Sequence, residues 1–576
     1  MVESGTGRPV AGAAVVATGE ALQKERTAHS DASGAFELAD LPPGAVFLEV
    51  QANGYQSSTR ENVAVHLDTT LSLLLELLPA DATGAAMRGG AQLPAIPAPS
   101  SAIVAVVARD QTELIPYGRE RQSFDAAAAA LPGVTVEPQG LRIPGAGPGQ
   151  SRTLIDGVDV TSSPPRLAQR FVEELSVLRG VYAAEFGRAT GAVVHAETRS
   201  GGNGFHGSLF GGVLPFELSR RQPGAALRAA GQGGVELGGP IQRDRLWFYG
   251  GFAPETVATA SGTITDLQYV GKLSFRPADG QSLSLSAFGD PGSGAGSNDF
   301  SLRYSGDAAG LRLDGAGSWH HARAGGDRTE GALSAGKSGQ LLGHHWLKAG
   351  ADVASESLGS AQQTLFAAFA QDSWGVVDSL WLDAGLRYEE QRGAGDEAAL
   401  LPRLGLSWDF TGRGLSRIFA AWGRFFQPAT LGGQGSLIES AFSSGAQLQL
   451  YRDLVASIDY THKRAFDGVV LSIGKHLSEN YLLQASYALS SPLPSSIFKL
   501  EAAYAYEWTP KTTVSLGVAL QAASSKLGLD LRAALRYALT EAYQLALNAD
   551  LLNALNHQAD ATEPPLSARL SAALSF

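Results

Sequence analysis

The sequence of 576 residues contains no cysteine, and this absence excludes a disulfide framework and thiol chemistry. It does not separate a cytosolic protein from a bacterial envelope protein. Charged residues make up only 17% of the chain and the net charge is −12, which argues against a nucleic-acid partner. No apolar run approaches the roughly 20 residues of a membrane-spanning helix. The longest candidate, 71–78, is interrupted by Ser72 and Glu76, so we expect a strand there.

A secretion signal is also missing. The first residues, MVESGTGRPV, contain neither a basic segment nor an apolar core. Val2 and Glu3 run directly into a turn at 4–7, as residues inside a strand would. We therefore expect a truncated or processed N-terminus, and the missing signal argues only weakly against export.

Short strands separated by turns fill residues 1–80, the first of the roughly two to four domains that this chain length predicts. Their spacing predicts a small β-sandwich. The strand-like stretches are 11–17, 36–38, 46–50, 63–65 and 71–75.

Three segments of this first unit, GRPVAGAAV, DASGAFELADLPPG and LEVQANGY, resemble the carboxypeptidase regulatory-like domain. The resemblance implies a recognition or spacer module, with a purely structural stalk as the alternative. A peptidase is excluded, because the unit has no zinc-ligand spacing such as His-x-x-Glu with a later His.

Residues 81–100 are small, Pro- and Gly-rich and unpatterned, which predicts a linker. The linker ends at an apolar run, SAIVAVV, at 101–107. This run is either the first strand of the next domain or an exposed strand that adds to the edge of a partner's sheet. The apolar residues that would make the partner contact are Ile103, Val104, Val106 and Val107.

Residues 101–201 mix helix-like and strand-like segments. Alanine costs least in a helix, so FDAAAAAL at 124–131 predicts a helix. A helix followed by a strand is expected within 165–178. The Gly-rich loop at 144–150 lacks the Lys-Ser/Thr pair and the following helix of a phosphate-binding loop. The other predicted strands are 134–136, 141–143, 152–155 and 192–198.

Long ordered blocks in this region resemble the plug domain of TonB-dependent outer-membrane receptors. The blocks are LPGV, LRIPGAGPGQSRTLIDGVDV and VEELSVLRGVYAAEFGRATGAVVHAETRSGGNGFHGSLFG. The nearest subgroup carries the regulatory-like domain in front of the plug. The resemblance covers nearly the whole chain, and it implies an outer-membrane location with the N-terminal domain in the periplasm.

Residues 204–576 read as about 22 strand-like segments, the number and length that suit an outer-membrane barrel. Apolar residues alternate with small or polar ones, for example at 514–521 and 566–576. We expect short turns after even strands and longer ones after odd strands. Tryptophans favour the membrane interface. Trp247, Trp346, Trp374, Trp381, Trp408 and Trp508 lie near even turns, and Trp319 and Trp422 lie near the other rim.

The predicted fold class is therefore mainly β. It comprises a small N-terminal β-sandwich (1–80), an α/β plug domain (101–201) and an antiparallel transmembrane β-barrel of about 22 strands (204–576). The Gly-rich stretch 200–204 would be a tether that lets the plug move without displacing the first barrel strand.

No set of residues has the spacing of a catalytic site, so we expect no enzyme activity, no cofactor and no metal. The two histidine pairs, His320–His321 and His344–His345, are predicted to lie at opposite rims and cannot share a metal ion. We expect them to be solvated.

The resemblance implies particular site residues. Charges in the plug motif would hold the plug against the polar barrel wall, with ordinary surface charge as the alternative. The motif residues are Arg152, Asp156, Gly157, Arg179, Gly180, Glu185, Gly187 and Arg188. A ligand would bind plug loops 144–150 and 161–166, through Gly145, Gly147, Gln150, Ser162 and Arg166. The last residue, Phe576, resembles the aromatic signal read by the barrel-assembly machinery.

Two functions remain open from the sequence. The first is energy-coupled uptake of an unknown ligand, in which TonB, with its inner-membrane energising proteins, pulls the segment 101–107. The second is a plugged barrel that serves protein secretion, surface assembly or scaffolding, which short outer loops favour. Both place the barrel wall in contact with outer-membrane lipid.

Overall fold

The structure is a computed structural model. Of the predicted linker at 81–100 it describes only Asp81, and residues 82–100 lie outside the described residues. Among the described residues, no helix is both long enough and apolar enough to cross a bilayer. The structure describes residues 1–81, 101–116, 124–214, 227–292, 296–491, 495–555 and 566–576, apart from residues 5, 20–21, 39–40, 68, 70, 72, 74, 138–139, 148, 260–261, 309, 432, 434, 452, 465, 479 and 524–525.

The N-terminal unit contains a four-stranded antiparallel sheet and a two-stranded parallel sheet. The first has the order β3 (Arg26–His29), β2 (Ala14–Thr18), β4 (Gly44–Gln51) and β5 (Ser58–Val65), and the second pairs β1 (Val2–Glu3) with β6 (Glu76–Leu77). The predicted strand at 36–38 is wrong: Phe36 and Leu38 pack against the core from irregular backbone. Strand β3 takes a place in the sheet that the sequence did not predict.

The plug contains a five-stranded mixed sheet. Its order is β11 (Val158–Asp159), β10 (Arg152–Ile155), β13 (Ala192–Thr198), β12 (Val172–Arg179) and β7 (Ile103–Ala108). Beside the sheet lie a hairpin and four short helices. The hairpin pairs β8 (Thr135–Glu137) with β9 (Gly140–Arg142), and the helices are α1 (Arg109–Leu114), α2 (Phe124–Ala127) and the 3-10 helices Ala128–Ala130 and Gln169–Phe171.

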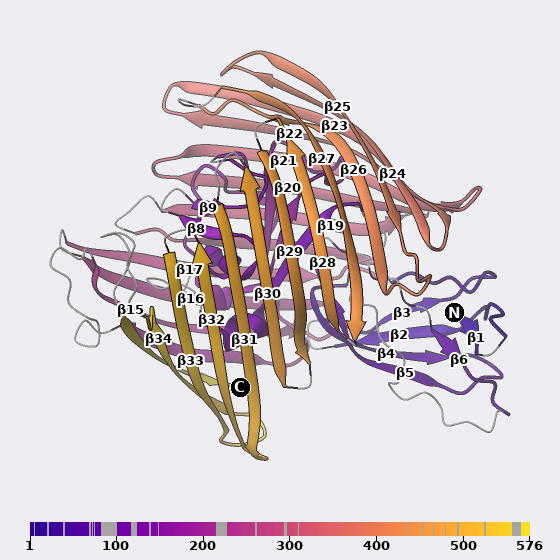
Figure 1. Cartoon of the computed structure of the whole chain (residues 1–576), viewed down its shortest axis with the longest axis horizontal. Helices are drawn as coiled ribbons and strands as arrows, with labels where there is room; N and C mark the ends of the chain where they lie inside the picture. The colour runs from indigo at the N-terminus through magenta and orange to yellow at the C-terminus, as the bar shows by residue number, and fades with distance from the viewer. Residues whose placement is uncertain are drawn as a thin grey trace.

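The barrel closes on itself, because its last strand pairs antiparallel with its first from Ser208↔Ser575 to Val213↔Leu570. Closure satisfies the backbone groups at both sheet edges, as a bilayer requires. The predicted 22-stranded antiparallel barrel is confirmed (Figure 1). The strands are β14 (His206–Leu214), β15 (Leu227–Gln242), β16 (Leu246–Thr259), β17 (Gly262–Phe275), β18 (Gln281–Gly289), β19 (Ser297–Ala308), β20 (Leu311–Ala322), β21 (Gly326–Gln340), β22 (His344–Leu358), β23 (Ala361–Val377), β24 (Leu380–Arg392), β25 (Glu397–Trp408), β26 (Ser416–Gln427), β27 (Leu437–Tyr451), β28 (Leu454–Lys463), β29 (Phe466–Ser478), β30 (Tyr481–Ser491), β31 (Ser495–Thr509), β32 (Thr512–Ala523), β33 (Lys526–Ala538), β34 (Gln544–Leu552) and β35 (Ser567–Ser575).

The two faces of the wall differ in polarity. Successive side chains of a strand point to opposite faces, so one face of each strand meets the exterior and the other the lumen. In β32, Leu516 is 62% exposed while Ser515 beside it is buried, and in β35, Leu570 is exposed while Arg569 is buried. The exterior is therefore apolar, as lipid requires, and the interior carries the polar and charged residues.

The two rims can be told apart by their connections. At one rim, each odd-numbered strand from β15 to β33 is connected to the strand that follows it (β15 to β16, β17 to β18, up to β33 to β34). We call this the short-turn rim, and we call the opposite rim the long-loop rim. The three longest connections in sequence join β14 to β15, β26 to β27 and β34 to β35, and the strand ends that they join belong to the long-loop rim. The predicted alternation is wrong in detail, because β22 ends at Leu358 and β23 begins at Ala361 on that same rim.

The N-terminal unit lies at the short-turn rim (Figure 1). Lys24 pairs with Asp279, in the turn between β17 and β18, at 3.3 Å. Gln23 donates a hydrogen bond to the carbonyl of Gly201, just before β14.

The stretch 200–204 does not behave as a loose tether. A Cβ on Gly201 would overlap the carbonyl oxygen of Phe248, so the glycine permits a close approach to the wall. Asn203 accepts hydrogen bonds from the Trp247 indole (2.8 Å) and from the backbone of Asp244 (3.0 Å). Trp247 is fully buried, unlike Trp408 and Trp508, which face outward at the same rim.

Candidate functional site

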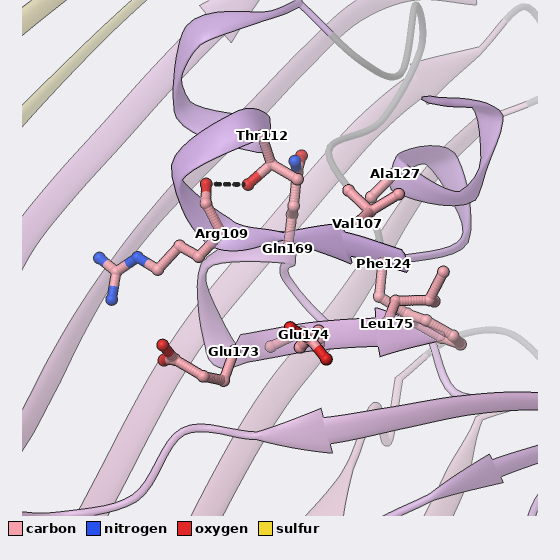
Figure 2. Close-up of a pocket in the computed structure, with 10 residues that line it drawn as sticks. Val107, Arg109, Thr112, Phe124, Ala127, Gln169, Glu173, Glu174 and Leu175 are labelled. Atoms are coloured by element: carbon pink, nitrogen blue, oxygen red, sulfur yellow. Dashed lines mark hydrogen bonds between the residues drawn. The ribbon is translucent and has the colours of Figure 1, made fainter. Parts of the chain in front are cut away.

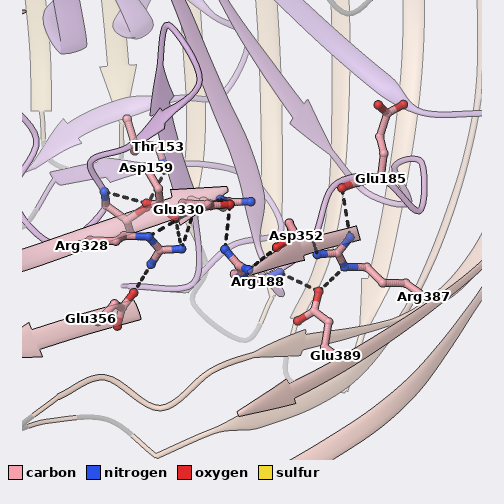
Figure 3. Close-up of polar contacts among 12 residues, drawn as sticks. Thr153, Asp159, Glu185, Arg188, Arg328, Glu330, Asp352, Glu356, Arg387 and Glu389 are labelled. Carbon is pink, nitrogen blue, oxygen red and sulfur yellow. Dashed lines mark hydrogen bonds and ion pairs between the residues drawn. The ribbon is translucent and has the colours of Figure 1, made fainter. Parts of the chain in front are cut away.

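A group of eight charged side chains joins the plug to the barrel wall. The plug supplies Arg152, Asp159 and Arg188, and strands β21, β22 and β24 supply the rest. We call the set the plug–wall network: Arg152, Asp159, Arg188, Arg328, Glu330, Asp352, Arg387 and Glu389 (Figure 3).

Glu330 of the wall lies between two plug arginines. Its carboxylate is 2.9 Å from Arg152 Nη2 and 2.8 Å from Arg188 Nη1. Arg188 also pairs with Asp352, which is 2.9 Å from Arg387 Nη2. Arg152, Arg188 and Arg387 are buried, and the side chains of Glu330 and Asp352 are only 10% and 11% exposed, so each charge depends on its partner for compensation.

Asp159 receives two guanidinium groups, Arg152 Nε at 2.7 Å and Arg328 Nη2 at 2.9 Å. Burial alone would raise its pKa, but the positive charges of Arg328 and Arg152 outweigh burial and lower the pKa to about 2. A carboxyl with a depressed pKa stabilises the folded state above its unfolded pKa of about 3.9. That stabilisation is lost as the pH falls toward 2, so these pairs persist at neutral pH.

A second contact lies at the turn between β10 and β11. Asp156 and Gly157 both have positive φ, 47° and 80°, as a tight two-residue hairpin turn requires. Asp156 accepts hydrogen bonds from the backbone (2.8 Å) and hydroxyl (2.5 Å) of Thr198. Lys272 of β17 lies 3.3 Å from Asp156 and 2.5 Å from Glu197, so one wall cation joins the turn to the end of β13.

A third contact lies where β12 ends. Arg179 Nη2 is 2.9 Å from Asp459 of β28, and both side chains are less than 5% exposed. Beyond it, Glu185 pairs with Lys348 of β22 at 2.6 Å. Gly187 passes so close to the wall that a Cβ there would overlap Glu389 and Arg387. Gly180 has φ +74°, which turns the chain after β12.

The sequence analysis predicted that charged residues of the plug motif contact the wall, but it did not predict which wall residues they contact. Glu330, Asp352 and Asp459 are charged residues at lumen-facing positions of otherwise amphipathic strands. Asp459, for example, is buried while its neighbour Ile458 is 46% exposed to the exterior. That alternation was readable in the sequence, but which plug residue each one meets depends on the closed barrel.

Both predicted ligand-facing loops lie toward the long-loop rim. The carbonyl of Gly145 accepts a hydrogen bond from Lys463, the last residue of β28. The Gly147 amide donates to Gln150 Oε1 at 2.7 Å, which closes that loop on itself. Arg166 is half-exposed and pairs with Asp266 of β17 at 3.2 Å.

Ser162 lies beside His320, whose predicted solvation is wrong. His320 is only 1% exposed, because its side chain points into the lumen. Its Nδ1 is 2.5 Å from Asp299, and its Nε2 is 3.4 Å from Ser162 Oγ. The side chain of His321, on the other face of the strand, is 46% exposed, as expected. In the described part of the chain, no group of three or more His, Asp or Glu side chains is arranged to hold a metal ion.

The segment 101–107 lies inside the barrel as the edge strand β7 of the plug sheet. It pairs antiparallel with β12, from Arg179↔Ile103 to Glu174↔Ala108. Ile103 and Val107 are buried, and Val104 and Val106 are partly exposed. Ser101 donates two hydrogen bonds to Asp383 of β24, at 3.0 and 2.8 Å, which fixes the start of the segment on the wall.

A small hollow lies at the other end of β7, lined by Val107, Phe124 and Leu175 on its apolar side and by Arg109 and Glu173 at its charged side (Figure 2). Glu174 is beside it and binds the N-terminal unit: its carboxylate is 2.8 Å from His66 Nδ1 and accepts a hydrogen bond from the Leu67 amide. Burial raises the pKa of Glu174, and the bond to His66 opposes that rise.

Phe576 lies at the short-turn rim, where its backbone exchanges two 3.0 Å hydrogen bonds with Gly207 of β14. Its ring is 45% exposed and lies 6.0 Å from that of Tyr543. The terminal residue thus closes the barrel at its seam.

Comparisons with known proteins agree with this architecture. Residues 1–77 match the family model of the carboxypeptidase regulatory-like domain, and residues 202–449 match that of the TonB-dependent receptor-like β-barrel. The TonB-dependent transporter Oar of Myxococcus xanthus is 32% identical over 278 residues, which span 44% of this chain and 26% of that relative.

Solved structures share the fold. The siderophore receptor PirA from Pseudomonas aeruginosa superposes with a TM-score of 0.65 at 17% identity, over 82% of this chain and 99% of that one. The alcaligin receptor FauA from Bordetella pertussis gives 0.62 at 14% identity, over 83% and 95%. At such identities the likeness establishes the fold alone.

The closed barrel with a plug in its lumen defines a plugged outer-membrane barrel. Its barrel matches the TonB-dependent receptor-like family model, and its N-terminal unit matches the carboxypeptidase regulatory-like model. The matched region spans about a quarter of the length of its curated relative.

The buried Arg179–Asp459 pair gives a direct test of how the plug is fixed. Arg179→Met leaves a buried carboxylate without its guanidinium, and we expect it to destabilise the plug by about 3–5 kcal/mol. The matched control is Arg166→Met, whose pair with Asp266 is half-exposed, and the expected loss is about 0–1 kcal/mol. Adding Asp459→Leu to Arg179→Met should recover most of the loss. Urea unfolding of the plug within the intact barrel measures all three, and equal losses for both single variants would contradict the assignment.

Proposed function

We propose that the protein is a receptor for energy-coupled uptake of a ligand through the barrel. The observation that carries the proposal is the plug–wall network, which keeps the lumen closed through buried ion pairs with the wall. Breaking such a pair by moving one partner is costly, and a pulling force can supply that work. The TonB-dependent receptor-like family model that the barrel matches supports the same function.

The N-terminal unit is placed in the periplasm by this proposal. It contacts the short-turn rim, and in outer-membrane barrels the short turns are periplasmic. The plug loops 144–150 and 161–166 then face the cell exterior and receive the ligand.

The proposed partners follow from the same orientation. TonB, with its inner-membrane energising proteins, would engage β7 through Ile103, Val104, Val106 and Val107. Strand β7 is an edge strand, so its second edge is available for strand addition once it leaves the lumen. Phe576 at the seam would be read by the barrel-assembly machinery, and the exposed apolar face of the wall contacts outer-membrane lipid.

Cross-linking in cells tests the TonB assignment. Because the chain has no cysteine, a single Val106→Cys variant can be joined by a bis-maleimide to a TonB that carries one cysteine. We expect an adduct that decreases when the proton gradient is collapsed. Thr153→Cys, on β10 of the same sheet, is the matched control and should give none. Equal adducts at both positions, or none at Val106→Cys in energised cells, would contradict it.

A second function, in protein secretion, surface assembly or scaffolding, is favoured by one feature. Several long-loop-rim connections are very short, such as 359–360, and short loops enclose a small ligand poorly. A deletion strain separates the two functions. Uptake predicts a growth defect on one class of nutrient among iron sources, cobalamin, glycans and peptides, with an unchanged secreted proteome. A defect confined to the secreted proteome would contradict uptake.

A further inference from the structure

Two plug segments far apart in sequence lie in contact beneath the long-loop rim. The Gly191 amide donates a 2.9 Å hydrogen bond to the carbonyl of Gln150. A Cβ on Gly191 would lie 2.6 Å from the Cβ of Ala146, so only glycine permits this approach. The loop 144–150 therefore rests directly on Thr190 and Gly191, which lead into β13.

Two wall residues each bind both of these segments. Lys463, at the end of β28, donates to the carbonyl of Gly145 at 2.5 Å and also to the carbonyls of Thr190 and Gly191. Gln427, at the end of β26, donates its amide to the carbonyl of Gly149 and accepts a 2.9 Å hydrogen bond from the Thr190 hydroxyl.

The buried ammonium group of Lys463 needs hydrogen-bond acceptors, and the contact with the two plug segments supplies them. Its side chain is among the most completely buried of the described residues, and Glu439 acts on it electrostatically without forming an ion pair. An ammonium has three donors, and a buried charge must be compensated. Three backbone carbonyls of the plug do this, so neither segment can move away without leaving the cation under-coordinated.

The same segments continue covalently into the plug–wall network. Thr190 is two residues after Arg188, which pairs with Glu330 and Asp352. At its other end β13 reaches Glu197, which pairs with Lys272. A displacement of the loop 144–150 is therefore passed through hydrogen bonds to Thr190 and through two peptide units to Arg188.

We propose that Lys463 and Gln427 are positioning residues that couple the outer plug loop to the ion pairs of Arg188. A load on the exterior surface of the loop shifts Thr190 and Gly191 and weakens the pairing of Arg188 with the wall. The inference rests on the proposed function for the origin of the load, a ligand. The coupling itself is a property of this chain and can be measured without ligand or TonB.

The test places a defined load on the loop in the full-length protein. In the cysteine-free chain, Gly147→Cys is labelled with a bulky maleimide, since a Cβ at 147 meets only the flexible Gln150 side chain. Amide hydrogen exchange of residues 188–194 is compared with and without the label. Coupling energies between sites correspond to roughly 5–150-fold, so we expect labelling to speed exchange there by at least about fivefold.

In Lys463→Met and in Gln427→Ala the response to the label should fall below about twofold, whereas Lys463→Arg, which keeps the charge, should retain part of it. Lys499→Met is the matched control: Lys499 is equally buried and also donates to plug carbonyls, among them Leu131 at 3.2 Å, but it contacts neither coupled segment. It should leave the response intact.

Two results would overturn the proposal. One is a label that leaves exchange at 188–194 unchanged in the otherwise unaltered chain. The other is a full response that persists in Lys463→Met and Gln427→Ala. Heat-modified mobility on gels identifies any variant whose barrel has not folded, and the two independent variants keep the test decisive. Failure of uptake in cells with the exchange response intact would count against the proposed function alone.

Discussion

The structure depends on one constraint, the compensation of charges buried between the plug and the barrel wall. A barrel in lipid presents its apolar side chains outward, and the alternation of the strands then brings the polar ones inward. Without a plug, Glu330, Asp352 and Asp459 would face a wide water-filled lumen. With the plug in place they lose that water, and Arg152, Arg188 and Arg179 replace it.

This arrangement suits a part that must remain in place and yet be moved. Buried ion pairs often contribute little net stability compared with apolar packing, but separating one is expensive. The plug is therefore fixed in one position without requiring a large free energy of association. Apolar contacts supplement the pairs, as where Phe171 of the plug meets Phe210 of the wall at 6.3 Å. The N-terminal unit adds a further contact through His66 and Glu174.

Local pattern and motif predicted much of the fold from the sequence. The strands β10 and β13 were predicted to the residue, because each is a short segment with apolar residues that lies between turn-forming residues. The predictions were wrong where tertiary contacts, rather than the local sequence, determine the conformation or the burial of a residue. Phe36 and Leu38 show the alternation of a strand, but neither lies in a strand of the structure. His320 was predicted to be solvated, but its side chain points into the lumen and contacts Asp299. The wall partners of the plug motif, and the place of Lys463, depend on contacts between residues that are 116 to 318 positions apart in the sequence, which no local pattern encodes.

The account's central claim is that the plug closes the lumen by its contacts with the wall. It is tested most directly by joining the two covalently. The Cβ that Gly385→Cys would add lies 2.8 Å from the Cβ of Ala184, so Ala184→Cys with Gly385→Cys can form a disulfide after a small shift. In planar bilayers, urea should open a reversible conductance through the unaltered protein, none through the oxidised variant, and a normal one after reduction. A conductance in the oxidised variant equal to that of the unaltered protein would contradict the claim.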